Sequence, residues 1–204
     1  MNQNRIKIIG VTGGIATGKS TVSGIIDNMG YKVIDADKIA KDVVKIGKPG
    51  YQKIIDVFGK DILDENCNIN RKKLGRLIFE DSILREKLNN IVHSFVLESI
   101  KDLINKYRNE SIIFVDVPLL IEEMDKLNEY EITFDEIWLV YVDESTQLDR
   151  LIKRDLISKD EAIKKIRAQI PIELKREYAT RIIDNRKDLE TLEEQVKNIV
   201  DKLR

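Results

Sequence analysis

Gly13-Gly14-Ile15-Ala16-Thr17-Gly18-Lys19-Ser20 fits the pattern G-x-x-x-x-G-K-[ST] at every fixed position, which is the pattern of a phosphate-binding P-loop. The preceding residues, 6–11, form a short apolar and β-branched run that is typical of a buried parallel strand. The following residues, 21–29, have apolar side chains at helical spacing, and Gly30 is placed to end a helix. A P-loop requires this context of strand, glycine loop and helix, so we predict that the stretch binds a nucleoside triphosphate.

The residue types in this loop suit phosphate chemistry. Glycines allow a tight turn that presents backbone N–H groups to an anion at the positive end of a helix. Lys19 is expected to reach the β- and γ-phosphates, and the Ser20 hydroxyl is expected to bind Mg²⁺. The alternative, an ordinary glycine turn, is disfavoured because every fixed position matches.

The composition limits the class of protein. The chain has 204 residues, 42% of them hydrophobic, and its 35 basic and 36 acidic side chains give a net charge of -1. This balance provides no overall attraction to nucleic acid or to an anionic membrane, so we expect neither as a partner. The single cysteine, Cys67, excludes an intramolecular disulfide, and no run approaches the ~20 apolar residues of a membrane-spanning helix. We therefore expect a cytoplasmic protein. We also expect a monomer, with an oligomer as the open alternative.

Strand-like and helix-like segments alternate along the chain. Further apolar strand patterns occur at 31–35, 111–116, 137–142 and 181–184, with helical patterns between them. This alternation predicts an α/β fold, a three-layer P-loop NTPase-type domain with a five-stranded parallel sheet. Residues 48–107 read as helical throughout, which predicts a substrate-binding insertion. Its last part, from Asp81 or Ser82 to Tyr107, is either one long helix or two helices joined near His93.

Acidic residues follow two of the predicted strands. Asp35-Ala36-Asp37 ends the second strand, and ligands of such sheets bind beyond the carboxyl ends of the strands. A carboxylate here suits the deprotonation of an acceptor hydroxyl, but either aspartate alternatively caps the next helix. Asp116 ends the third strand, where an acid either holds Mg²⁺ through water or bonds to loop amides.

Several motifs together resemble the dephospho-CoA kinase family. They are the P-loop, residues 33–40 around Asp-Ala-Asp, Pro118-Leu119-Leu120 after the third strand, and the segments 147–155, 166–169 and 182–185. The resemblance runs along nearly the whole chain in order. It implies transfer of the γ-phosphate of ATP to the ribose 3′-hydroxyl of dephospho-CoA, with Mg²⁺, as the last step of coenzyme A synthesis.

The resemblance also implies an organisation and site residues. The nucleotide-binding core comprises residues 1–47, 108–153 and 181–204, with the helical substrate domain at 48–107 and a lid at 154–180. The catalytic residues are Lys19, Asp37 as the base and Arg154 at the lid hinge. Acceptor contacts are Thr12, Asp37, His93 and Pro118. ATP contacts are Gly14, Ile15, Ala16, Thr17, Gly18, Lys19, Ser20 and Thr21.

Three positions depart from the family pattern. Ala16 and Cys67 stand where the family has glycine, and alanine is tolerated at position 16 unless the backbone there needs a positive φ. Ser94 replaces the proline that follows the family histidine, which lets the helix around His93 continue. Two other functions fit a P-loop chain of this kind: a nucleoside or nucleotide monophosphate kinase, and a non-catalytic nucleotide-dependent switch.

Overall fold

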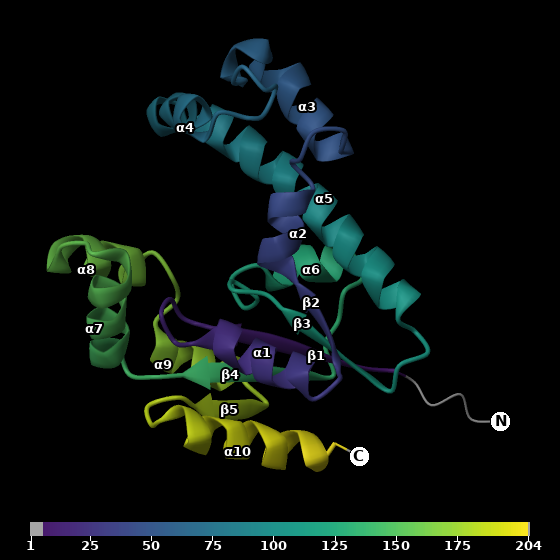
Figure 1. Cartoon of the computed structure of the whole chain (residues 1–204), viewed down its shortest axis with the longest axis vertical. Helices are drawn as coiled ribbons and strands as arrows, with labels where there is room; N and C mark the ends of the chain where they lie inside the picture. Colours follow the sequence, from purple (N-terminus) through teal and green to yellow (C-terminus); the bar gives the residue numbers. More distant parts are fainter. Residues whose placement is uncertain (1–5, 204) are drawn as a thin grey trace. The chain divides into compact units, whose positions relative to one another are not determined.

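The computed structural model describes residues 6–203, so residues 1–5 and 204, which the predicted core includes, lie outside the described part. Its sheet has five parallel strands in the order β2-β3-β1-β4-β5 (Figure 1). The strands are β1 (Lys7–Gly13), β2 (Lys32–Asp35), β3 (Ile112–Asp116), β4 (Glu136–Tyr141) and β5 (Arg181–Asp184). The predicted five-stranded parallel α/β sheet is therefore confirmed.

Helices occupy most of the remaining chain. They are α1 (Lys19–Asn28), α2 (Ala36–Asp42), α3 (Pro49–Phe58), α4 (Arg71–Glu80), α5 (Ser82–Lys106), α6 (Met124–Glu129), α7 (Glu144–Asp155), α8 (Lys159–Arg167), α9 (Ile172–Lys175) and α10 (Leu189–Asp201). Two short 3₁₀ turns, Lys60–Ile62 and Arg176–Tyr178, complete the set. Within residues 6–203, no helix combines the length and the apolar character needed to cross a bilayer.

Helices pack on both faces of the sheet because strand side chains alternate in direction. In β4, Trp138 and Val140 belong to an apolar cluster completed by α1 and α10. Leu139 and Tyr141, which point to the other face of the sheet, pack with Ile172 of α9. Trp138 is fully buried.

The described residues form two compact units. The first contains the sheet and comprises the residues up to Asp35 and those from Ile104 onward; the second spans Ala36–Leu103. The second unit thus begins at Ala36, whereas the predicted substrate domain begins at residue 48. The functional division into core, substrate domain and lid stays a prediction.

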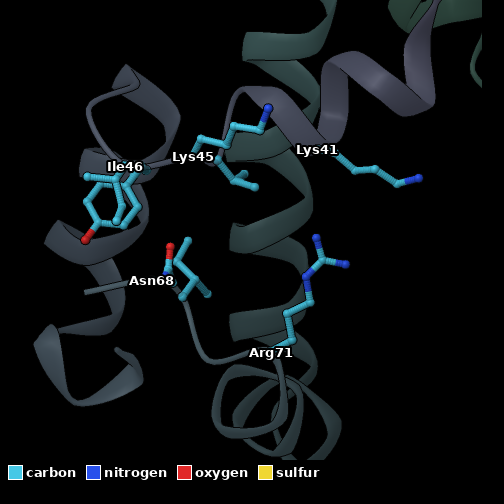
Figure 2. A pocket seen from close by; sticks show the side chains of 8 residues that line it. Lys41, Lys45, Ile46, Asn68 and Arg71 are labelled. Carbon is cyan, nitrogen blue, oxygen red and sulfur yellow. The ribbon is translucent and has the colours of Figure 1, made fainter. Parts of the chain in front are cut away.

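The second unit is helical around its own small core. Ile54, Ile62 and Leu74 are buried there, and apolar residues of α5 pack against them. α5 is one continuous helix of 25 residues through His93, which settles the alternative of two joined helices. The unit also contains a pocket between the end of α2 and the start of α4 (Figure 2).

Candidate active site

The P-loop lies between the end of β1 and the start of α1. Gly18 precedes the helix with φ of 87°, and the Thr17 hydroxyl donates to the Gly14 carbonyl at 2.9 Å. The loop therefore closes on itself immediately before the helix N-terminus. Backbone N–H groups and the positive end of the helix dipole meet at this point, which favours an anion.

Two glycines of the loop are required by close neighbours. A Cβ on Gly14 would lie 2.3 Å from the Gln147 side-chain nitrogen. A Cβ on Gly18 would lie 2.1 Å from the Asn185 side-chain nitrogen, and the positive φ there adds strain for any other residue. Because neither glycine has a Cβ, an amide side chain has room to approach the loop backbone at each position.

Three side-chain amides, Gln147, Gln169 and Asn185, bond to the backbone of the loop, and we call them the amide clamp. Gln147 Nε2 donates to the Ile15 carbonyl, and Gln169 Oε1 accepts from the Ile15 N–H, both at 2.8 Å. Asn185 Nδ2 donates to the Thr17 carbonyl at 2.8 Å. The clamp residues come from α7, from the segment after α8 and from the end of β5, so three distant parts of the first unit fix one loop.

Asp116 connects β3 to the P-loop helix. Its side chain is 2% exposed and contacts the Lys19 ammonium, and the Ser23 hydroxyl donates to it at 2.6 Å. Asp116 thus contacts a lysine and a hydroxyl of α1, and no bond from a loop amide to it is seen among the described residues. Asp35 is paired with Asp116 in the register of β2 and β3, so both acids lie at the carboxyl edge of the sheet.

The donor chemistry near the loop fits a magnesium ion. Ser20 is exposed in the first turn of α1, and Asp116 supplies carboxylate oxygens at the adjoining strand end. Hydroxyl and carboxylate oxygens are hard ligands, and Mg²⁺ is usually held by one or two of them together with substrate phosphates. The described residues contain no group of three or more His, Cys, Asp or Glu arranged to hold a metal.

A cavity of about 520 Å³ opens beside the loop. Its cationic lining comprises Arg150, Arg154 and Lys187, and no acidic side chain is among the described residues that line it. Arg154, the predicted catalytic arginine, is exposed and pairs with Asp155 at 2.8 Å. A cationic cavity beside a P-loop suits the phosphates of a nucleotide.

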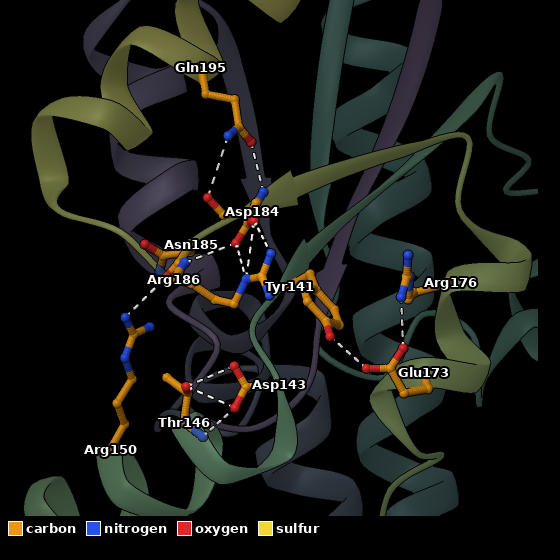
Figure 3. A network of polar contacts seen from close by, with 10 residues as sticks. All are labelled: Tyr141, Asp143, Thr146, Arg150, Glu173, Arg176, Asp184, Asn185, Arg186 and Gln195. Carbon is orange, nitrogen blue, oxygen red and sulfur yellow. Dashed lines mark hydrogen bonds and ion pairs between the residues drawn. The ribbon is translucent and has the colours of Figure 1, made fainter.

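Arg150 of α7 is bonded to the chain and is not only a solvated surface charge. Its guanidinium donates to the Asn185 carbonyl at 2.8 Å, so it braces a residue of the amide clamp (Figure 3). Nearby, the Arg186 guanidinium pairs with Asp184 at 2.6 Å and lies 5.6 Å from the centre of the Tyr141 ring. Pairing with Arg186 lowers the pKa of Asp184, which keeps this carboxylate charged.

Thr12 and Pro118, two predicted acceptor contacts, lie together at the end of β1. Thr12 is fully buried, and its hydroxyl donates to the Pro118 carbonyl at 3.2 Å. Four residues after Pro118, Glu122 accepts from the Ile170 N–H at 3.1 Å and pairs with the buried Lys175 at 2.7 Å. The segment after β3 is thereby attached to the region around α9, within the range predicted as the lid.

Asp37 and His93 belong to the second unit. Asp37 is an exposed residue in the first turn of α2, and Asp35, the last residue of β2, immediately precedes that helix. Asp37 is thus inside the helix, not at its N-cap position. His93 lies partly buried in α5. Their roles as base and acceptor contact stay predictions.

The amide clamp is the part of the site that the sequence did not reveal. Segments 166–169 and 182–185 stood out as family motifs, but a single glutamine or asparagine carries no spacing pattern that indicates its partner. The only local signal for the clamp is that positions 14 and 18 are glycines. The reason for these glycines is seen only in the structure, where the amides of Gln147 and Asn185 lie against them.

The chain is similar to known proteins of one family along most of its length. The family model described as dephospho-CoA kinase matches residues 7–191. The dephospho-CoA kinase of Carboxydothermus hydrogenoformans is 47% identical over 97% of this chain and 94% of its own length. That of Staphylococcus epidermidis is 39% identical over 96% and 94%. The solved dephospho-CoA kinase of Campylobacter jejuni superposes with a TM-score of 0.67 at 27% identity, covering 97% of each chain. The chain belongs to the dephospho-CoA kinase family.

Proposed function

We propose that this protein transfers the γ-phosphoryl group of ATP to the 3′-hydroxyl of dephospho-CoA, giving coenzyme A and ADP in the cytoplasm. The observation that carries the proposal is the clamped P-loop with Lys19 beside the buried Asp116, in a chain of this family. A P-loop alone is shared by many activities, and family membership is what selects this acceptor.

The donor half of the site is the P-loop. The phosphates are received by N–H groups of the loop other than that of Ile15, which donates to Gln169, and those of Thr17 and Thr21, which donate to backbone carbonyls. Lys19 exchanges its contact with Asp116 for the β- and γ-phosphates. Ser20 and, through water, Asp116 would hold Mg²⁺, and the ion would offset charge on the transferring group. Arg154 leaves its exposed pair with Asp155 to contact the phosphates as the lid, residues 154–180, closes over the nucleotide.

In the acceptor half, the Asp37 carboxylate accepts the proton of the 3′-hydroxyl. The acceptor oxygen forms a bond to the γ-phosphorus, and the bond from that phosphorus to the β,γ-bridging oxygen breaks, leaving its electron pair on ADP. Thr12, Pro118 and His93 contact the acceptor. An exposed carboxylate on a short helix is free to approach a substrate hydroxyl, which supports this role for Asp37.

The test is ADP production from ATP and Mg²⁺, measured with dephospho-CoA, with adenosine monophosphate and with no acceptor. The proposal requires turnover that depends on dephospho-CoA and a product phosphorylated at the 3′ position. Turnover with adenosine monophosphate instead would indicate a nucleotide kinase. ATP binding without acceptor-dependent turnover would indicate a switch.

A further inference from the structure

The second compact unit contains a cationic pocket whose lining residues have no role in the function proposed above. It encloses about 320 Å³ and is lined by Lys41, Lys45, Arg71 and Asn68 above the apolar side chains of Val44 and Ile69. The cationic groups come from α2, from the turn after it and from the first residue of α4 (Figure 2). No carboxylate is among the described residues that line the pocket.

The charges of this pocket are available to a ligand. Lys45 pairs with Asp42 at 3.1 Å, and Asp42 also pairs with Lys48 at 3.1 Å. These pairs are exposed, and exposed ion pairs contribute little, so a polyanion displaces them at small cost. Several cations without an acid between them favour phosphate oxygens, and the Arg71 guanidinium suits bidentate contact with phosphate.

The other residues that line the pocket limit the chemical class of its ligand. The cations lie next to apolar side chains and to the Asn68 amide, which is both donor and acceptor. A ligand that fills this pocket therefore joins a diphosphate to an uncharged arm containing amides. In the acceptor proposed above, a nucleoside 5′-diphosphate is esterified to an arm of this kind.

The position of Asp37 gives an independent geometric argument. Lys41 lies four residues after Asp37 in α2, so the two side chains share one helix face about 6 Å apart along the axis. The 3′-hydroxyl and the 5′-diphosphate of the acceptor are carried by the same ribose. A hydroxyl held at Asp37 therefore leaves the diphosphate within reach of the side chain one turn further on.

We propose that Lys41, Lys45 and Arg71 bind the diphosphate of the acceptor, and that Val44, Ile69 and Asn68 contact the start of its arm. This inference rests on the proposed function. It identifies positions that set the affinity for the acceptor and have no part in binding ATP.

The test compares Lys41→Gln and Arg71→Gln with the control Lys72→Gln, a neighbouring exposed lysine that does not line the pocket. The KM values for dephospho-CoA and for ATP are measured in the full-length enzyme. Each pocket variant is expected to raise the KM for dephospho-CoA by about tenfold or more, the effect of losing a charge-assisted hydrogen bond. In the pocket variants, the KM for ATP is expected to stay at the wild-type value. In the control Lys72→Gln, both KM values are expected to stay at wild type. Arg71→Lys is expected to recover part of the lost affinity for dephospho-CoA.

An unchanged KM for dephospho-CoA in both pocket variants overturns the inference, as does an equal rise in the KM for ATP or an equal effect of Lys72→Gln. Circular dichroism melting checks folding, and Lys41→Gln carries the test if Arg71→Gln does not fold. If the wild-type protein does not phosphorylate dephospho-CoA, the proposed function fails. If wild-type turnover is normal and the variants do not differ from it, only the pocket assignment fails.

Discussion

Ala16 has a φ of 62°, in the left-handed region that alanine adopts only with strain. Alanine is unstrained at this position only with a negative φ, and the backbone of Ala16 does not meet that condition. Cys67, the other position where the family has glycine, has a φ of 61°. At both positions the backbone has a positive φ, which accounts for the glycine of the family. This chain keeps that backbone conformation with a residue other than glycine.

We predict that Ala16→Gly raises the free energy of unfolding by about 0.5–1 kcal/mol, because relief of left-handed strain outweighs the added freedom of the unfolded chain. Urea unfolding followed by the fluorescence of Trp138 measures this, since that single tryptophan is buried in the sheet of the first unit. The control is Ala168→Gly, where φ is -75° and alanine is unstrained. A loss of stability in Ala16→Gly equal to that in the control would contradict the account.

Local side-chain chemistry fixes several helix starts. Asn70 accepts from the N–H groups of Lys72 and Lys73, and Ser158 and Glu161 form a capping box. Such signals lie within four residues of the helix start, so the sequence contains them completely. α6 was missed because its six residues, Met124–Glu129, are too few to show a helical period.

The amide clamp connects the P-loop to other segments of the first unit. We predict that Gln169→Ala raises the KM for ATP by about three- to tenfold, the effect of one lost hydrogen bond on a loop that must hold its geometry. Steady-state kinetics with varied ATP measures the change. The matched control is Gln195→Ala, because Gln195 accepts from the Asp184 N–H at 2.7 Å and makes no bond to the P-loop. Equal effects of the two variants would show that Gln169 is an ordinary structural amide.

At the scale of the whole molecule, the alternation of strands and helices predicted the parallel sheet, but not the order of its strands. Strand order depends on which buried edges pair, and all five strands have similar apolar patterns. The same limit applies to the site. Lys19, Ser20 and Asp116 follow from a motif and a strand end, whereas the partners of Gln147 and Asn185 lie more than a hundred residues away.

Glu136 connects three strands of the sheet. It is mostly buried and accepts from Lys7 of β1 at 2.6 Å, from Trp138 of β4 at 2.9 Å and from Arg181 of β5 at 2.6 Å. Burial alone would raise the pKa of Glu136, but the hydrogen bonds from Arg181, Lys7 and Trp138 outweigh it and lower the pKa to about 2. The folded protein therefore favours the charged carboxylate.

Because the pKa of Glu136 is lower in the folded state, its stabilising contribution is present above pH 4.5 and is lost as the pH falls toward 2. We predict that Glu136→Gln lowers the free energy of unfolding at pH 7 by up to about 3 kcal/mol and has about half of that effect or less at pH 3, where the carboxylate of the unfolded chain is already mostly protonated. Urea unfolding followed by circular dichroism at the two pH values measures this. An equal loss at both would indicate that packing, not the charge, is responsible.

The central claim is that the P-loop supplies the donor half of a two-substrate site and that Asp37 supplies the base for the acceptor hydroxyl. The most direct measurement is the rate of phosphoryl transfer to dephospho-CoA by Asp37→Asn in a rapid-quench experiment, with ATP affinity determined on the same preparation. We predict that transfer slows by about 10²-fold or more while ATP affinity is retained, because only proton acceptance is removed. Transfer at the wild-type rate would contradict the account.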